Sequence, residues 1–359
     1  MNDIDYGSYE ATVEQSNRLE EAIRRNPTNF RVLTGDRPTG RLHVGHLFGS
    51  LENRVRLQNL NVPIFIVIAD YQVLTDRDHA DNIADNVHNL VVDYLAAGMD
   101  PEKYRTFIFT HSLVPELNQL LIPFLTLVTN SELNRNPTVK EEIQASGQQQ
   151  INSGMYVYPV HQAADILFCK ATVVPVGKDQ LPHLELTRTI ARRFNSRFKT
   201  DTPVFPEPQP LLSNAPTILG LDGSQKMSKS RNNAIMLSAS EDETARCIKT
   251  AKTDIDRHIT YDPINRPEVA NMLLMASLCT NEDPHVLASE IGDAGASRLK
   301  SMLTEALNEY LRPIRKRRQE LEKEPDYIRR ILKNGADQAR EAAQKTLVEV
   351  RQAMEMIYE

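Results

Sequence analysis

The chain has 359 residues, with 42 Lys and Arg against 48 Asp and Glu, a formal net charge of −6 at pH 7 and 40% hydrophobic residues. This composition is that of a globular protein long enough for two domains, and it excludes a small scaffold held together by disulfides. The longest apolar runs, residues 62–69 and 120–128, are far shorter than the roughly 18 residues of a membrane helix, so we expect no membrane span.

The first 30 residues are predicted to form a helical appendage. Residues 1–15 lack a basic start followed by an apolar core, so neither a signal peptide nor a transit peptide is expected, and the predicted location is cytoplasmic. Helical spacing of apolar residues over 8–25 ends at Asn26 and Pro27, a pair that stops a helix. We expect this helix to pack on the surface of the molecule.

From residue 31 onward, strand-like and helix-like runs alternate, and the strand-like runs are apolar throughout. The strand-like runs are 30–35, 62–70, 105–110 and 171–177, and the helix-like runs are 42–60, 82–97, 115–129, 158–170 and 181–195. Continuously apolar strands that alternate with helices are typical of a parallel sheet with helices on both faces. The predicted fold class is therefore α/β with a doubly wound parallel sheet.

Two stretches interrupt this alternation. Residues 130–156 are polar and Gln-rich, which suggests an insertion that leaves the sheet. The Pro-rich passage 200–210 is followed by a polar loop with several glycines over residues 219–234. We expect no regular structure in that loop.

An all-helical domain is predicted over residues 239–359. Its start is marked by a capping-box pattern, either Ser240 with Glu243 or Ser238 with Glu241. The predicted domains are therefore 1–30, 31–238 and 239–359. The three cysteines, Cys169, Cys247 and Cys279, are far apart and form no Cys-x-x-Cys pair, so neither a disulfide framework nor a metal site is predicted.

The junction between the first strand and the first helix carries His43 and His46. Because these positions are three apart in the first helical turn, both imidazoles lie on one face beside unpaired backbone N–H groups. Gly45 between them would let a phosphate approach the backbone closely. Imidazole N–H groups could stabilise phosphate oxygens during attack at phosphorus. The alternative is two partly exposed histidines on an ordinary capped helix.

A second motif, Lys-Met-Ser-Lys-Ser, occupies residues 226–230 within the polar loop. Two lysines three apart on a loop could reach the outer phosphates of a nucleotide and neutralise a leaving pyrophosphate. A solvated basic loop would have the same composition, and for a short run taken alone that alternative is favoured.

Taken together, His-x-Gly-His after the first strand and Lys-Met-Ser-Lys-Ser late in the α/β region resemble the class I aminoacyl-tRNA synthetases. Within that class the length is similar to the tryptophan and tyrosine subclass. Residues 158–188 closely resemble the bacterial tryptophanyl-tRNA synthetases, and the similarity runs from about Val32 to the end of the chain. The resemblance implies a Rossmann-like catalytic domain and a helical domain that binds the tRNA anticodon.

The resemblance also implies which residues form the site. The implied catalytic residues are His43, His46, Lys226 and Lys229. The implied ATP-binding residues are Arg37, Thr39, Gly40, Gly45, His46, Gly177, Asp179, Lys226, Met227, Ser228, Lys229 and Ser230. The implied tryptophan-binding residues are Leu33, Gly35, Arg37, Tyr158, Gln162, Asp165, Ile166, Val174, Val176 and Gln180.

Chemistry makes the central assignment reasonable, since Asp165 would accept the indole N–H and an indole has one donor and no acceptor. Tyr158 and Gln180 would hold the substrate ammonium. Four positions depart from the commoner bacterial pattern and bear on amino-acid specificity. They are Leu33 in place of an aromatic residue, Arg37 in place of Gln, Gln72 in place of His and Gln162 in place of Met.

The implied reaction has two steps. ATP, accompanied by Mg²⁺, activates L-tryptophan to tryptophanyl-adenylate with release of pyrophosphate, and the aminoacyl group then passes to the 3′ end of tRNA(Trp). The resemblance further implies a homodimer. Residues 311–340 carry ten Lys and Arg against five Asp and Glu, and we interpret this segment as a tRNA contact or, alternatively, as a solvated helix face.

Three other functions stay open on the sequence. The same reaction with tyrosine is the nearest, because a phenol hydroxyl can also donate to Asp165. A nucleotidyltransferase would use only the His-x-Gly-His half of the site, but it would leave the helical region unexplained. A non-catalytic RNA-binding protein would have no physical need for His43, His46 and both lysines of the loop.

Overall fold

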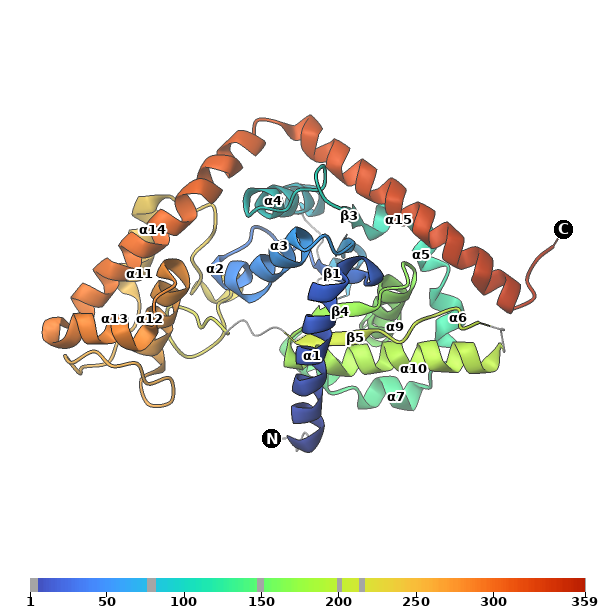
Figure 1. Ribbon diagram of the computed structural model, residues 1–359, viewed down its shortest axis with the longest axis horizontal. Coiled ribbons are helices and arrows are strands. Elements are labelled where there is room, and N and C mark those ends of the chain that lie inside the picture. The colour runs from blue at the N-terminus through green and yellow to red at the C-terminus, as the bar shows by residue number, and fades with distance from the viewer. Residues whose placement is uncertain (1–5, 76–81, 147–151, 199–201, 213–216, 359) are drawn as a thin grey trace.

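The computed structural model describes residues 6–75, 82–146, 152–198, 202–212 and 217–358. Within these residues a parallel sheet of five strands has the order β3-β2-β1-β4-β5 (Figure 1). The strands are β1 (Val32–Asp36), β2 (Ile64–Ile68), β3 (Thr106–Thr110), β4 (Val173–Val176) and β5 (Gln209–Leu212). In the register, Val32 of β1 lies opposite Ile64 of β2 on one side and Val173 of β4 on the other.

Alternate residues of the central strand β2 face two separate layers, as expected for a doubly wound sheet. Ile64, Ile66 and Ile68 pack in one hydrophobic cluster with α3 (Glu52–Asn59) and α4 (Ile83–Ala96). Phe65 and Val67 pack in another with α9 (Gly154–Leu167) and α10 (Leu181–Arg197). The predicted α/β class with helices on both faces is confirmed.

Strand β5 was not predicted, because it begins in the Pro-rich passage. Its residue Pro210 has no backbone N–H to donate, and proline is compatible with a sheet mainly at an edge. Since β5 is the last strand in the sheet order, it lies at such an edge. Pro210 pairs in register with Val174 of β4.

Both edges of the sheet are covered by helices from the two ends of the chain (Figure 1). Helix α1 (Tyr6–Arg25), which corresponds to the predicted appendage, lies against β5, where Ser16 Oγ accepts the Leu212 N–H at 2.8 Å. Helix α15 (Pro325–Ala353) lies along β3, and a Cβ on its Gly335 would be 2.0 Å from the carbonyl oxygen of Ile108. This glycine therefore permits the close contact. Covered edges protect a sheet from pairing with other chains.

In the described part of the polar stretch 130–156 lie α7 (Asn130–Arg135), α8 (Pro137–Ser146) and the start of α9. Thr129 and Glu132 form a capping box at the start of α7. Residues 147–151, which carry the Gln-rich part of the predicted insertion, lie outside the described residues.

In the helical region, one of the two predicted capping boxes is present, between Ser240 and Glu243 at the start of α11. The helices of this region are α11 (Glu241–Thr250), α12 (Pro267–Thr280), α13 (Pro284–Ile291) and α14 (Gly295–Leu321). Helix α14 runs from this group back over the α/β region, and α15 continues along the sheet (Figure 1). The boundary near residue 238 stays a prediction. Among the described residues, none of the helices combines the length and apolar character that a bilayer crossing requires.

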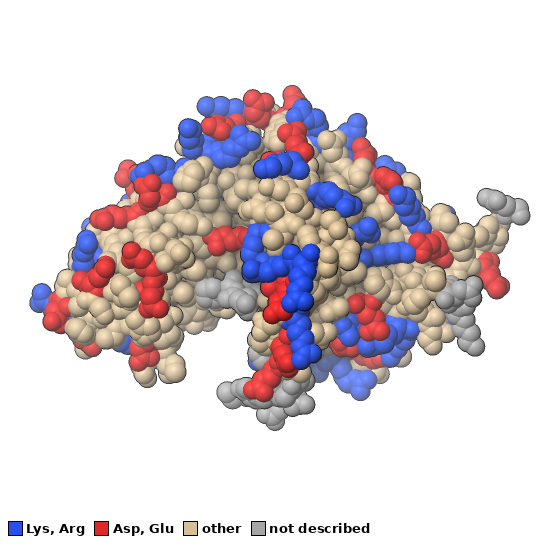
Figure 2. Space-filling view, viewed as in Figure 1, with Lys and Arg blue, Asp and Glu red and all other residues tan. Residues whose placement is uncertain are grey.

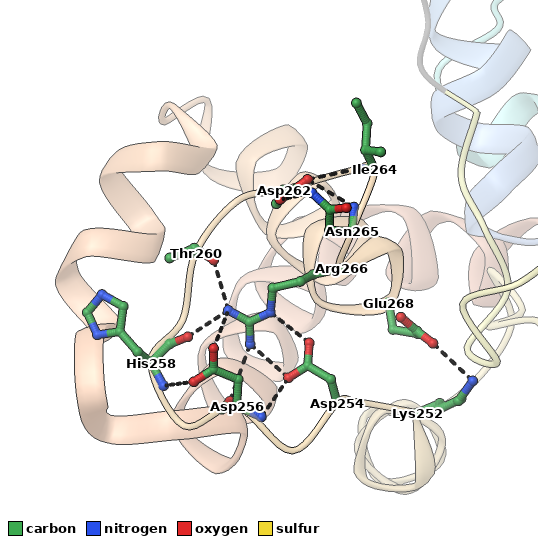
Figure 3. Close-up of polar contacts among 10 residues, drawn as sticks. All are labelled: Lys252, Asp254, Asp256, His258, Thr260, Asp262, Ile264, Asn265, Arg266 and Glu268. Carbon is green, nitrogen blue, oxygen red and sulfur yellow. Dashed lines mark hydrogen bonds and ion pairs between the residues drawn. The ribbon is translucent and has the colours of Figure 1, made fainter.

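The loop between α11 and α12 is organised by Arg266 (Figure 3). Its guanidinium binds both carboxylate oxygens of Asp254, at 2.7 and 2.8 Å, and donates to the carbonyl oxygen of His258 at 2.6 Å and to Thr260 Oγ at 2.8 Å. Asp262 in turn accepts the N–H groups of Ile264 and Asn265. Because a planar fork of donors ties several backbone positions together, this loop is held without helix or strand.

Candidate active site

A cavity of about 350 Å³ opens at the carboxyl ends of β1 and β4. In the sheet order β3-β2-β1-β4-β5 the chain turns to opposite sides after these two strands, which is where ligands bind in open α/β sheets. All ten residues predicted to bind tryptophan line the cavity, namely Leu33, Gly35, Arg37, Tyr158, Gln162, Asp165, Ile166, Val174, Val176 and Gln180. The structure therefore gathers them, while their roles toward a ligand stay predictions.

Asp165 belongs to α9 and is only 2% exposed. Its Oδ1 lies 3.0 Å from Nε2 of His111, a fully buried residue in the turn after β3. On the other side of the imidazole, Nδ1 of His111 lies 3.8 Å from a carboxylate oxygen of Asp70. A buried imidazole therefore stands between two carboxylates.

This arrangement shifts the pKa of both partners. Burial by itself lowers the pKa of His111, but the charges of Asp165 and Asp70 outweigh it, and the pKa of His111 is raised. Burial likewise raises the pKa of Asp165, but His111 and His161 outweigh it, and the pKa of Asp165 is lowered. Asp165 is therefore ionised and can only accept hydrogen bonds.

His111 was not predicted from the sequence. It is the first residue after β3, and ligands of a parallel sheet collect at the carboxyl ends of the strands, so its position was the available signal. Nothing local distinguishes it, because Asp165 follows 54 positions later in the chain.

His161 completes this cluster, and one possible ligand atom from each of His111, His161 and Asp165 lies within 4.8 Å of the others. Such spacing is also found in metal sites. However, His161 Nε2 lies 2.7 Å from Asn118 Oδ1, and His111 Nε2 lies on Asp165. A hydrogen bond to Asn118 thus engages His161, and His111 and Asp165 form a close ion pair with each other, so we assign no metal here.

The opposite wall of the cavity is polar. Tyr158 O–H and His183 Nε2 lie 3.1 Å apart, and Nδ1 of His183 lies 3.3 Å from the amide nitrogen of Asn136. Burial lowers the pKa of His183 to about 4, so its imidazole is neutral at pH 7. Gln180 donates to Asp179 Oδ2 at 3.0 Å. Gln180, which is predicted to hold the substrate ammonium, is thereby fixed beside Asp179, which is predicted to bind the ATP ribose.

Asp36 and Arg54 also line the cavity, and neither was predicted. Asp36, at the end of β1, receives hydrogen bonds from Arg54 at 2.6 Å and from the hydroxyl of Tyr94 at 2.5 Å. Burial raises the pKa of Asp36, but the Arg54 charge outweighs it, and the pKa falls to about 2. The cavity therefore holds a second ionised carboxylate next to Arg37.

His43 and His46 lie at the start of helix α2 (Val44–His46), which continues through a π-helical turn (Leu47–Leu51) into α3. Their ring centroids are 3.7 Å apart, and the backbone N–H of His43 donates to Nδ1 of His46 at 3.3 Å. Burial and nearby positive charges lower the pKa of His43 to about 3 and that of His46 to about 4. Both imidazoles are neutral at pH 7, so each carries one N–H donor.

The loop with residues 226–230 contacts the segment that carries His43 and His46. Lys229 Nζ donates to the carbonyl oxygen of Thr39 at 3.1 Å, and Met227 is buried. A Cβ on Gly45 would lie 3.2 Å from Cβ of Met227, so the glycine permits the contact. Residues 229–231 form a short 3₁₀ turn where no regular structure was predicted, and the side chain of Ser230 lies outside the described part of the structure.

Asn233, which the sequence analysis passed over, fixes the base of this loop. It is 4% exposed, and its Oδ1 accepts the Ser228 N–H at 2.8 Å while its amide donates to the Asp222 carboxylate at 3.2 Å. The two motifs are thus brought together from positions about 180 residues apart in the chain. Thr39, Gly40 and Lys229 meet here as well, since a Cβ on Gly40 would be 3.0 Å from Lys229 Nζ.

Several basic side chains of the segment 311–340 are paired with acidic side chains. Arg318 is buried and its Nη1 lies 2.6 Å from Asp93 Oδ1. Figure 2 shows Lys and Arg interleaved with Asp and Glu along α14 and α15 rather than in one continuous patch. Acidic partners within 4.0 Å are present for Arg312, Arg317, Arg318, Arg329, Arg330 and Arg340.

Comparison with known proteins identifies the family of the chain. Residues 25–312 match the family described as tRNA synthetases class I (W and Y). The tryptophan–tRNA ligase of Treponema pallidum (strain Nichols) is 41% identical over 345 residues, covering 90% of this chain and 96% of that relative. The tryptophan–tRNA ligase of Streptococcus mutans is 43% identical over 338 residues, covering 91% of this chain and 98% of that relative.

The crystal structure of tryptophanyl-tRNA synthetase from Campylobacter jejuni, complexed with ADP and tryptophan, is 29% identical in sequence. It superposes with a TM-score of 0.77 over 90% of this chain and 99% of that chain. The family match spans most of the α/β and helical regions described above. The chain therefore belongs to the class I tRNA synthetases of the tryptophan (W) and tyrosine (Y) family.

Proposed function

We propose that this chain is a tryptophan–tRNA ligase, which activates L-tryptophan with ATP and transfers it to the 3′ end of tRNA(Trp), releasing pyrophosphate and then AMP. The observation that carries the proposal is Asp165, a buried, ionised acceptor that lines the cavity beside apolar side chains, in a chain about 42% identical to tryptophan–tRNA ligases. An indole N–H satisfies this acceptor, and amino acids that cannot donate there leave a buried carboxylate unpaired.

The walls of the cavity suit an indole ring. Leu33 comes from β1, Ile166 from α9, and Val174 from β4, and all three are nearly buried. Tyr158 and Gln180 then face the substrate ammonium. Arg37 pairs with the substrate carboxylate, a charge-assisted contact that orients it for attack.

The first step is attack of the tryptophan carboxylate oxygen on the α-phosphorus of ATP. The new bond forms as the bond to pyrophosphate breaks, and no protein nucleophile takes part. His43 and His46 donate N–H groups to the phosphate oxygens, and Lys226 and Lys229 neutralise the leaving pyrophosphate. Mg²⁺ enters with ATP as part of the substrate complex and adds positive charge at the phosphates.

The nucleotide lies between the two motifs. Thr39, Gly40 and Gly45 allow its phosphates to approach the backbone, and Gly177 with Asp179 receives the ribose hydroxyls. Residues 226–230 cover the phosphates. In the second step, the terminal ribose hydroxyl of tRNA attacks the carbonyl carbon of the adenylate and AMP leaves.

A homodimer acting in the cytoplasm is part of the proposal. Exposed apolar side chains lie on the turns that follow the neighbouring strands β2 and β3, with Tyr71 42%, Leu74 51% and Leu113 43% exposed. Apolar residues grouped at one end of a sheet favour contact with a second copy. Sedimentation at micromolar concentration should give twice the mass of the chain, and a monomer would contradict this part.

Exchange of pyrophosphate with ATP tests the central proposal. It is run in parallel with tryptophan, tyrosine and phenylalanine, followed by charging of tRNA(Trp). The chain contains no Trp, so the fluorescence of the substrate reports its binding directly. Exchange with tryptophan alone is expected. Exchange with tyrosine alone would overturn the substrate, and no exchange would overturn the reaction.

A further inference from the structure

The residue behind Asp165 offers an inference that rests on the proposed function and deepens it. We infer that His111 is a positioning residue for amino-acid recognition, which holds the Asp165 carboxylate in place so that it meets the indole N–H. With Oδ1 engaged by His111 at 3.0 Å, Oδ2 is the oxygen that we assign to the indole. Recognition of the side chain then depends on a residue that does not touch the substrate.

His111 is itself fixed from every side. Its Nδ1 lies 3.8 Å from Asp70, which is held by the N–H groups of Tyr71 and Ser112 and by the Ser112 hydroxyl. The ring of His161 packs edge-on against it, with centroids 4.6 Å apart and an angle of 79°. The ring of Tyr71 lies 5.9 Å away. An imidazole enclosed in this way cannot swing, so the carboxylate it binds is fixed as well.

The chemistry explains why such a partner is needed. A carboxylate buried in an apolar pocket without a cation tends to take up a proton, and a protonated carboxyl presents a donor on one oxygen. That donor cannot pair with an indole N–H. A fixed imidazole that pairs with Oδ1 at 3.0 Å keeps the carboxylate an acceptor and fixes its direction, which is how a supporting shell of residues preorganises a binding group.

A pair of substrates separates this role from a merely structural one. The isostere β-(benzothiophen-3-yl)alanine has sulfur where tryptophan has the indole N–H, so it cannot donate to Asp165. For His111→Ala we expect kcat/KM for tryptophan in pyrophosphate exchange to fall about 30- to 100-fold, the usual scale for losing a charge-assisted buried hydrogen bond. The loss should lie mainly in KM, whereas the isostere should change by less than about threefold.

Two further variants make the test sharper. His111→Gln keeps an N–H donor of similar reach, so it should recover most of the tryptophan activity. It also keeps the test decisive if His111→Ala fails to fold. When Asp165 is already replaced by Ala, adding His111→Ala should not change the ratio of kcat/KM between tryptophan and the isostere any further. The reason is that both residues act through the same hydrogen bond to the indole.

The outcomes are distinguishable. If the parent enzyme shows no exchange with tryptophan, the proposed function fails. If the parent is active but His111→Ala loses both substrates equally, or loses neither, the positioning role is overturned. Zinc bound in a one-to-one ratio by the parent and absent from His111→Ala would also overturn it, in favour of a metal site.

Discussion

Histidines lie at both ends of the candidate site, and their neighbours shift their pKa values in opposite directions. Burial lowers the pKa in every case. At the end that we propose for the nucleotide, burial and nearby lysines lower the pKa of His43 to about 3 and that of His46 to about 4. At the amino-acid end, His111 lies between Asp70 and Asp165, and its pKa is raised.

The difference shows that the surroundings of a histidine, and not its residue type, decide whether its imidazole is charged. In the proposed function, Lys226 and Lys229 supply positive charge to the phosphates, so a neutral imidazole is sufficient there as a hydrogen-bond donor. Where a buried carboxylate must stay an acceptor, the imidazole supplies the missing cation. The same side chain thus serves two tasks, and the surrounding charges select between them.

Breaking the support of the nucleotide end should have the largest effect. Arg318 pairs with Asp93 in the interior, and Asp93 Oδ2 accepts the N–H of Leu42, the residue before His43, at 2.7 Å. Arg318→Ala leaves a buried carboxylate without its cation. We expect the free energy of unfolding, measured with urea, to fall by about 3–5 kcal/mol. KM for ATP should rise, and KM for tryptophan should not.

A double variant controls for this effect. Arg318→Leu combined with Asp93→Asn leaves no unpaired charge, so it should be less destabilised than Arg318→Ala. Burial already raises the pKa of Asp93 to about 6 despite Arg318, which indicates how costly this carboxylate is. Equal destabilisation of the two variants would mean that packing, and not charge, holds α14 in place.

Removing a donor at the nucleotide end should come next. His46→Ala is expected to lower kcat for pyrophosphate exchange by about 10²- to 10³-fold, the scale for one preorganised donor on a developing charge. His46→Asn keeps a neutral N–H donor and should retain much of the rate. Tryptophan binding, followed by substrate fluorescence, should stay unchanged in both. A rate that recovers only with a cationic replacement would show that His46 acts in its charged form.

Features of the fold that have a local sequence pattern could be predicted, whereas contacts between distant residues could not. The capping box at Ser240 and the apolar strand β2 have local patterns, and both were predicted. Strand β5 has none, because Pro210 is tolerated only at an edge that the sequence does not reveal. Arg318 stands within a run of basic residues, and its burial depends on Asp93, 225 positions earlier.

The site follows the same division. The ten cavity residues predicted to bind tryptophan came from the resemblance to a family, whereas Asp36 and Arg54 were not predicted. His111 was not predicted, because it acts through Asp165 on a different element. Asn233 was not predicted either, although its partners Ser228 and Asp222 lie in the same loop. A hydrogen bond between distant elements leaves no spacing to recognise.

Lowering the pH should separate the two groups of histidines. The folded-state pKa values of His43 and His46 lie below the unfolded value of about 6.5, so their contribution to stability is present above pH 6.5 and is lost as the pH falls toward 4. We expect each to cost roughly 1–2 kcal/mol of unfolding free energy between pH 7 and pH 5. The variant His43→Gln/His46→Asn should lose less over this range. A slope equal to that of the parent would contradict neutral imidazoles at the nucleotide end.

The smallest effect is expected from the outer carboxylate of the amino-acid end. At 3.8 Å, Asp70 is too far from His111 Nδ1 for a hydrogen bond, so it acts on the imidazole only through its charge. Asp70→Asn should therefore raise KM for tryptophan by about threefold and leave KM for ATP unchanged. Ser112→Ala, which keeps the charge of Asp70, is the matched control and should have less effect. A loss as large as that of His111→Ala would mean that Asp70 and His111 act as one unit, so that the carboxylate which recognises the indole is held by a chain of two residues.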